Sequence, residues 1–216
     1  MKSNLRCWAL SVGLLFFISP AGAADWPQFR GPNSSGIAPG DSPPVEFGPG
    51  KNELWHAPLA PGHSSPVVVG DVIFLTTYDR NRKKIAVVCL ARRTGKVLWE
   101  RAVPIDRVEK GHASFNPASS TPASDGQRVV AYFGAVGLIC FDLEGKKLWE
   151  RKMPLAKTFG GNATSPAIIP DKVILYRSNY IDHYLLAHHK LTGKELWKCG
   201  GMPNNCLLYT SPSPRD

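Results

Sequence analysis

The chain has 216 residues and a net charge of +9, from 26 Lys and Arg against 17 Asp and Glu. A basic balance permits attraction to anionic surfaces such as lipid headgroups or envelope polymers. No nucleic-acid-binding motif accompanies the charge, so we expect no nucleic-acid partner. The densest basic run, residues 80–84, lies between two strand patterns and is interpreted as a solvated hairpin tip.

Residues 1–23 are typical of a secretory signal peptide. Lys2 and Arg6 make the start positive, residues 8–18 are uncharged and mostly apolar, and residues 21–23 form a small-residue cleavage site. The apolar run is short for a membrane span, which needs about 20 apolar residues. We expect an exported protein, periplasmic or extracellular, with no transmembrane span; a retained N-terminal anchor is the alternative.

Residues 24–51 are assigned to an N-terminal strap, and a repeat begins after it. Four segments end in similar Leu-Trp patterns, and their tryptophans are spaced 44, 50 and 48 residues apart. A period of this length indicates an array of similar supersecondary units. Residues 52–59 carry only the last part of the pattern, so we expect an orphan outer strand of the blade that closes a ring.

Three complete units follow at residues 60–103, 104–153 and 154–203. In the first unit, β-rich segments alternate with turn signals, and strands are predicted at 65–69, 72–77, 85–90 and 97–100. The other two units repeat this order, and no stretch has a 3.6-residue apolar period. Four short antiparallel strands per unit predict the blade of an all-β propeller. We expect about three blades of a larger ring with seven to eight blades.

The repeated turn predicts how neighbouring blades dock. A tryptophan near each blade's edge is well placed to fill the gap to the next blade, and glycine supplies the turn before it. The predicted docking residues are Trp55, Trp99, Trp149, Trp197, Gly95, Gly145 and Gly193. Cys89 and Cys140 occupy equivalent positions in neighbouring units, commonly too far apart for a disulfide. Both are therefore expected to be buried small hydrophobes.

Residues 206–216 break from the repeat completely. Their reverse translation resembles a transposon-based sequencing adapter, so we expect a read-through artefact and a gene product that continues differently. The alternative is a Ser/Pro-rich tail. On this interpretation, further blades lie outside the chain.

The Gly-Lys-x-Leu-Trp turns resemble the tryptophan-docking motif of pyrroloquinoline quinone (PQQ)-type β-propellers, whose pattern is Ala-x-Asp-x-x-Thr-Gly-Lys-x-x-Trp. Cys89, Cys140 and Ala187 stand at the small position, and Asp142 keeps the acid. Ala91 and His189 replace that acid in the other two blades. The resemblance covers residues 52–198, and residues 25–32 are similar to the start of secreted bacterial members. It implies a propeller fold.

The resemblance divides by function. One branch consists of quinoprotein dehydrogenases, which use PQQ and calcium, an adjacent cysteine pair, a stacking tryptophan and Glu, Asn and Asp around the metal. No adjacent cysteine pair occurs here. The other branch is non-catalytic and includes BamB-like scaffolds of outer-membrane protein assembly. The resemblance favours a binding or scaffold module with protein partners in the cell envelope, monomeric at full length, and no evident cofactor. A PQQ- and calcium-dependent dehydrogenase with its site in absent blades, and a ligand sensor, are the alternatives.

Three polar segments precede the innermost strands and are expected to share one face around the axis. They define a possible funnel with six candidate residues: His63, Ser64, Asn116, Ser119, Asn162 and Thr164. The alternative is that their hydroxyls satisfy backbone groups at turns. His63 and His112 are the nearby groups able to transfer protons, but we predict no catalytic residue.

Histidines also cluster near the end of the third unit, at His183, His188 and His189. On one strand, His188 and His189 point to opposite faces, and His183 and His189 lie about 20 Å apart. One metal ion cannot bind all three. The sequence contains no G-x-S-x-G, H-E-x-x-H or phosphate-binding loop.

Overall fold

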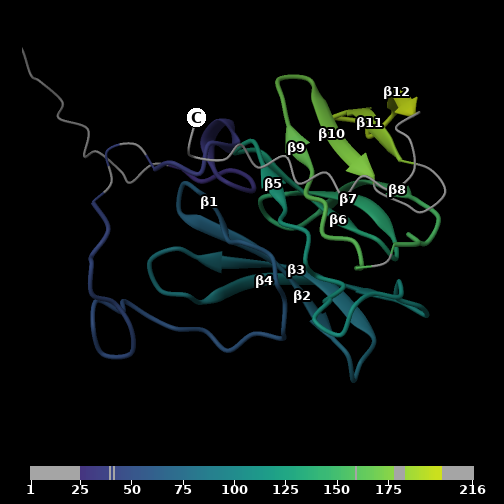
Figure 1. The fold of residues 1–216 in the computed structure, drawn as a ribbon. Helices are drawn as coiled ribbons and strands as arrows, with labels where there is room; N and C mark the ends of the chain where they lie inside the picture. The colour runs from purple at the N-terminus through teal and green to yellow at the C-terminus, as the bar shows by residue number, and fades with distance from the viewer. Residues whose placement is uncertain (1–24, 39, 41, 159, 178–182, 201–216) are drawn as a thin grey trace, which may run out of the picture.

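The computed structural model describes residues 25–38, 40, 42–158, 160–177 and 183–200. The expected signal peptide and the read-through tail lie outside these residues. The described chain is almost entirely β-structure, with one short 3-10 helix, η1 (Pro32–Ser34), before the first sheet. Three separate four-stranded antiparallel sheets follow one another along the sequence (Figure 1). The predicted all-β propeller with about three blades is confirmed as a partial propeller.

The first blade is a meander whose strands lie in chain order. Its strands are β1 (Val67–Val69), β2 (Val72–Asp79), β3 (Lys84–Ala91) and β4 (Val97–Pro104). Antiparallel neighbours need only short turns between them. The turn between β2 and β3 carries the basic run, and residues 80–83 are exposed, as expected for a solvated hairpin tip.

The second and third blades repeat this meander. The second contains β5 (Ala123–Ser124), β6 (Arg128–Phe133), β7 (Gly137–Asp142) and β8 (Lys147–Lys152). The third contains β9 (Ala167–Ile168), β10 (Lys172–Arg177), β11 (Tyr184–His189) and β12 (Glu195–Gly200). The inner strand β1 begins at Val67 and not at residue 65 as predicted, directly after Pro66, and β5 and β9 likewise begin directly after Pro122 and Pro166. Proline has no N–H to donate to a ladder, so the prolines delay pairing.

The second blade is covered on both faces. Along β6, Val129, Ala131 and Phe133 pack in a core with the first blade. The alternate residues Val130 and Tyr132 pack in a second core with the third blade. Successive strand residues point to opposite faces, which explains why β6 is apolar at nearly every position. Figure 1 shows the second sheet lying between the other two.

Each blade has the same irregularity opposite its tryptophan. Cys89 pairs with Trp99, and the register then shifts by one residue before the next pair. The second blade shows the same shift after the pair Cys140 and Trp149. In the third blade it follows the pair of Ala187 with its tryptophan. The small residue opposite each indole leaves room for it, and the bulge re-aims the strand end.

The N-terminal strap lies against the inner strands. Trp26 forms an antiparallel bridge with Val68 of β1, with N–O distances of 2.7 and 3.0 Å. The Ser124 N–H of β5 donates to the Pro27 carbonyl at 2.8 Å, so the strap spans two blades. Residues 52–59 form no β-ladder within the described chain. The expected outer strand is therefore an extended segment without a sheet partner among the described residues.

Candidate functional site

Trp99 shows how one blade contacts the next. Its indole Nε1 donates to the Leu143 carbonyl at 2.7 Å. Its ring lies so close to Gly145 that an added Cβ would be 2.8 Å from Trp99 Cδ2. Phe74 and Phe141 flank the indole at centroid distances of 5.8 and 6.0 Å. A glycine is required at this turn because its φ of +82° and the indole both exclude a side chain.

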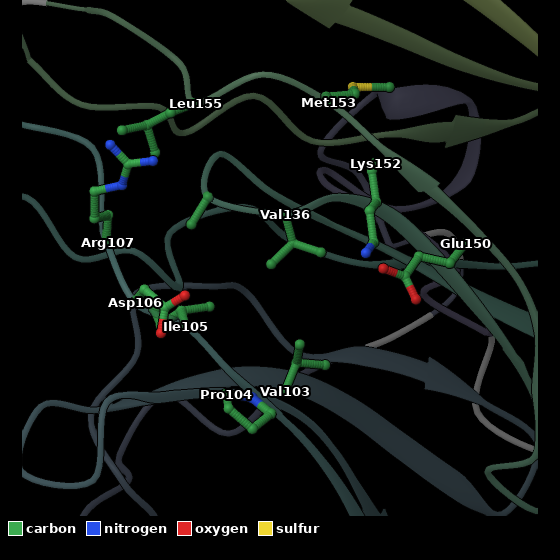
Figure 2. A pocket seen from close by; sticks show the side chains of 11 residues that line it. Val103, Pro104, Ile105, Asp106, Arg107, Val136, Glu150, Lys152, Met153 and Leu155 are labelled. Atoms are coloured by element: carbon green, nitrogen blue, oxygen red, sulfur yellow. The ribbon is translucent and has the colours of Figure 1, made fainter.

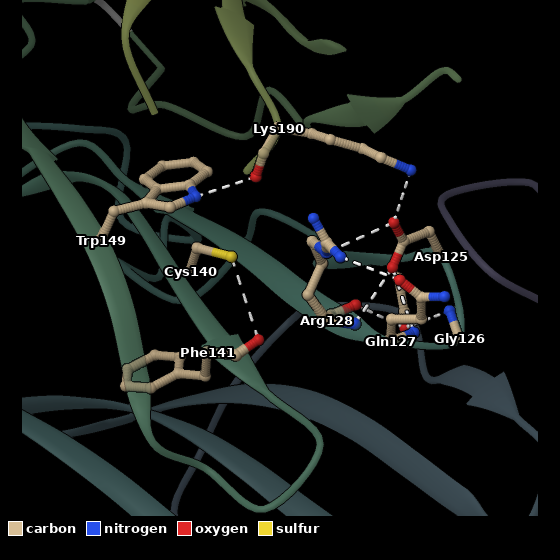
Figure 3. A network of polar contacts seen from close by, with 9 residues as sticks. Asp125, Gly126, Gln127, Arg128, Cys140, Phe141, Trp149 and Lys190 are labelled. Atoms are coloured by element: carbon tan, nitrogen blue, oxygen red, sulfur yellow. Dashed lines mark hydrogen bonds and ion pairs between the residues drawn. The ribbon is translucent and has the colours of Figure 1, made fainter. Parts of the chain in front are cut away.

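The same contact occurs at two other seams. The Trp149 Nε1 donates to the Lys190 carbonyl at 2.9 Å (Figure 3), and its ring packs on Gly193. The Trp55 Nε1 donates to a first-blade turn carbonyl at 2.9 Å, and the ring packs on Gly95. Trp55 thus lies at the position that a preceding blade's tryptophan would occupy. Trp197 differs, because it is 40% exposed.

Two arginines strengthen these seams, and the sequence reading missed them. The Arg101 Nε donates to the Gly145 carbonyl at 2.6 Å. Arg151 repeats this contact at Gly193 and also donates from Nη2 to the Thr192 carbonyl at 2.7 Å. A guanidinium fits adjacent carbonyls because its donors form a rigid fork. The Trp-Glu-Arg triplet that occurs in the first two blades could have indicated these contacts from the sequence. In the third blade Cys199 stands in place of the arginine.

A polar bridge joins the second and third blades near the β5–β6 turn. The Lys190 Nζ lies 2.9 Å from the Asp125 Oδ2, and the Arg128 Nε lies 3.4 Å from the same oxygen (Figure 3). Burial alone would raise the pKa of Asp125. Hydrogen bonds from Lys190 and from the Gln127 N–H, with the nearby positive charges, hold this pKa below its usual value.

The cysteines at the small positions are buried and free, as expected. Burial raises the pKa of the Cys89 thiol to about 11 and that of Cys140 to about 12. A thiol that stays protonated is a poor nucleophile and a poor metal ligand. Both residues therefore fill space beneath the indoles and offer no chemistry.

Three of the four funnel candidates on the first two blades bond to the backbone through their side chains. The Ser64 hydroxyl accepts from the Thr76 N–H at 2.9 Å. The Asn116 Oδ1 accepts from the Ala118 N–H at 2.8 Å, and the Ser119 hydroxyl donates to the Asn116 carbonyl at 2.6 Å. These contacts match the alternative in which polar side chains hold turns.

The remaining candidates divide between a buried contact and a cavity. The Asn162 Nδ2 donates to the Tyr132 hydroxyl at 2.7 Å, and its Oδ1 accepts from the Thr164 N–H at 3.2 Å. His63 and Asn116 line one cavity of about 1000 Å³. The other four funnel candidates do not line it, so the structure does not gather all six at one site.

Hydroxyls also link successive blades near the inner strands. The Ser65 N–H donates to the Thr121 Oγ1 at 3.0 Å. The Thr121 N–H in turn donates to the Ser165 Oγ at 3.0 Å. Each residue precedes the proline that opens an inner strand. The recurring Ser/Thr-Pro pair therefore holds the inner edges together.

A buried polar cluster that the sequence reading also missed lies at the ends of β6 and β10. Arg177 is 1% exposed; its Nη1 donates to the Tyr184 hydroxyl at 2.9 Å and its Nη2 to the Pro154 carbonyl. Burial raises the pKa of Tyr132 to about 12. Burial also raises the pKa of Glu109, which the charge of Arg177 opposes. No local sequence pattern signalled this cluster, because its members come from separate strands and connectors.

The described residues gather no cluster of metal-binding side chains of the quinoprotein kind. Calcium takes six to eight oxygen ligands, and no group of three His, Cys, Asp or Glu side chains that could hold a metal occurs in the described part of the chain. The buried carboxylate of Glu109 lies against Gly134, where an added Cβ would be 2.2 Å from Oε1. The backbone at Gly134 therefore encloses the Glu109 carboxylate on one side.

Comparison with protein families gives a match over residues 48–199 to the family described as outer membrane protein assembly factor BamB. The chain belongs to this family. A comparison with curated proteins finds no match. No helix among the described residues of this BamB-family chain is long and apolar enough to cross a membrane.

Solved structures similar to this BamB-family chain include dehydrogenases and a BamB. A europium-containing methanol dehydrogenase matches at 18% identity and a TM-score of 0.50, over 66% of this chain and 25% of that chain. BamB from Moraxella catarrhalis matches at 16% identity and a TM-score of 0.43, over 69% of this chain and 55% of that one. This chain spans about a quarter of the dehydrogenase's length, and the likeness shows the fold alone.

Proposed function

We propose that the chain is part of an exported, non-catalytic β-propeller that binds protein partners in the cell envelope. The observation that supports this best is the use of the polar loop residues. Ser64, Asn116 and Ser119 all bond to nearby backbone groups. A side chain committed to a turn holds the scaffold's shape and leaves binding to the surface of the loops.

The family match supports the same proposal. The matched model is described as an outer membrane protein assembly factor, and residues 1–23 carry the features of a secretory signal. Export is testable by fusing these residues to a phosphatase that is active only outside the cytoplasm. We expect activity from this fusion and none from a Lys2→Glu, Arg6→Glu fusion, because the positive start orients the signal.

Reconstitution with PQQ and calcium tests the non-catalytic part of the proposal. The full gene product, loaded with both, is assayed for dye-linked alcohol oxidation. We expect no turnover above that of the unloaded protein. Turnover that depends on both PQQ and calcium would overturn the proposal and assign the chain to the dehydrogenase alternative.

A further inference from the structure

Two connectors form a groove at the end of the blades where β4 and β8 finish. We call it the connector groove. Its outer half, about 360 Å³, lies between the end of β4 and residues 150–155 (Figure 2). Its inner half, about 680 Å³, lies between residues 107–110 and 155–158. Both halves share Arg107 and Leu155, so they are continuous.

The inner half of the connector groove is mainly apolar, whereas the outer half mixes apolar and charged side chains. Val108, Leu155 and Ala156 line the inner half, and Val136 and Met153 line the outer half. Val108 is 36% exposed although it sits among apolar neighbours. An apolar side chain of a partner inserted here would remove this surface from water.

The rim of the inner half is positive. Arg107, Lys110 and Lys157 line it, and no acidic residue among those the structure describes does. The outer half is lined by both signs of charge, Asp106 and Glu150 with Arg107 and Lys152. Figure 2 shows the Lys152 side chain ending beside the Glu150 carboxylate, and this carboxylate also lies 2.9 Å from the Lys147 Nζ. The groove as a whole therefore favours a negatively charged occupant, most strongly at its inner half.

The backbone beside the groove is open. Residues 106–108, 110 and 111 belong to no strand and are exposed, and within the described chain their N–H and C=O groups make no backbone hydrogen bond; Glu109 between them is buried. Exposed backbone of this kind can pair with an added extended segment. A lipid headgroup would match the charge but would leave this backbone unpaired.

We infer that the connector groove binds an extended acidic peptide segment of a partner protein. The segment lies along residues 106–111, inserts an apolar side chain between Val108 and Leu155, and places its carboxylates near Arg107 and Lys110. This inference rests on the proposed function, since it names the partner chemistry of the same binding module.

Fluorescence anisotropy on the 216-residue chain tests the inference with a labelled peptide, Gly-Asp-Asp-Leu-Glu-Asp-Ile-Gly. The control peptide replaces each Asp by Asn and Glu by Gln. We expect the acidic peptide to bind, the control to bind at least about tenfold more weakly, and binding to weaken as salt screens the charges. Equal binding of the two peptides, or binding of neither, would overturn the inference.

Matched charge reversals locate the site. Arg107→Glu with Lys110→Glu should weaken peptide binding at least about tenfold. Arg93→Glu with Lys96→Glu makes the same charge change at the β3–β4 turn, at the other end of the first blade, and should change affinity less than about threefold. Thermal melts check that both variants stay folded. Equal effects of the two pairs would overturn the inference.

Two further outcomes separate this inference from its rivals. The first outcome is that the chain binds phosphatidylglycerol vesicles but not the peptide, and that the charge reversal at Arg107 and Lys110 abolishes vesicle binding. The groove would then be a membrane site, and the inference would be wrong. The second outcome is PQQ-dependent turnover, which would overturn the proposed function. The peptide measurement would still decide whether the groove binds an acidic segment.

Discussion

The second and third blades share one repeat but differ in burial. In the second blade's outer strand, β8, Trp149 is 7% exposed and Glu150 and Arg151 are half-buried. In the third blade every residue of β12 is exposed, and Trp197 is 40% exposed. Their local patterns are alike, since both end in Gly-Lys-x-Leu-Trp. The difference teaches that a blade's outer strand is completed by its neighbour and not by its own sequence.

The comparison also distinguishes two kinds of docking residue. The glycine and tryptophan occur in all three blades, whereas the arginine two residues after the tryptophan occurs in the first two, and Cys199 replaces it in the third. The tryptophan contact is therefore common to the described seams, and the guanidinium contact is an addition at two of them. The predictions below test both parts, from the largest effect to the smallest.

Removing the two indoles should give unequal results. Trp149→Ala deletes a buried ring and its hydrogen bond to Lys190, and we expect it to lower the free energy of unfolding by about 3–5 kcal/mol. Trp197→Ala should cost less than about 1 kcal/mol, because this ring is already partly in water. Urea denaturation of both variants measures the difference. Equal losses would mean that burial against a neighbour does not decide the tryptophan's contribution.

Gly193→Ala tests close approach at the second seam. The residue has a φ of +66°, and an added Cβ would lie 2.6 Å from the Trp149 ring. We expect a loss of about 2–4 kcal/mol from backbone strain and overpacking together. Gly126→Ala is the matched control: its φ is +81°, and its nearest contact would be 3.7 Å away. The control should lose about 1 kcal/mol from strain alone.

Arg151→Met tests the guanidinium contact. The substitution keeps an apolar stem but removes the donors to the Thr192 and Gly193 carbonyls, so we expect a loss of about 1–3 kcal/mol in urea denaturation. Arg82→Met, on the exposed β2–β3 hairpin, should change stability by less than about 0.5 kcal/mol. A similar small change for both would show that the contact at Gly193 is replaced by water without cost.

Asp125→Asn tests the polar bridge between the second and third blades through its pH dependence. The pKa of Asp125 is lowered in the folded chain, so the carboxylate stabilises the fold above its unfolded pKa of about 3.9. This contribution is lost as the pH falls through the folded pKa. At neutral pH we expect the variant to be about 1–2 kcal/mol less stable. The gap should close in strong acid, and a gap that stays constant with pH would contradict the bridge.

Much of the fold was predictable from the sequence, because its strands follow local signals. The turn signals and the β-rich runs between them placed the four strands of the first blade within a few residues, and the same order recurs in the other two blades. The inner strands begin later than strand propensity alone indicates, because Pro66, Pro122 and Pro166 delay pairing. The candidate site was less predictable, since only two of the six funnel residues line a shared cavity.

The sequence by itself determined the blade: its four strands, its turns, and the placement of a tryptophan beside a glycine turn. These depend on neighbours along the chain and on side-chain alternation. Only the tertiary structure decided which residues meet across a seam, such as Arg151 with Gly193 and Lys190 with Asp125. It also formed the connector groove from two connectors far apart in sequence. Contacts between distant segments depend on how whole sheets stack, and local patterns do not encode that stacking.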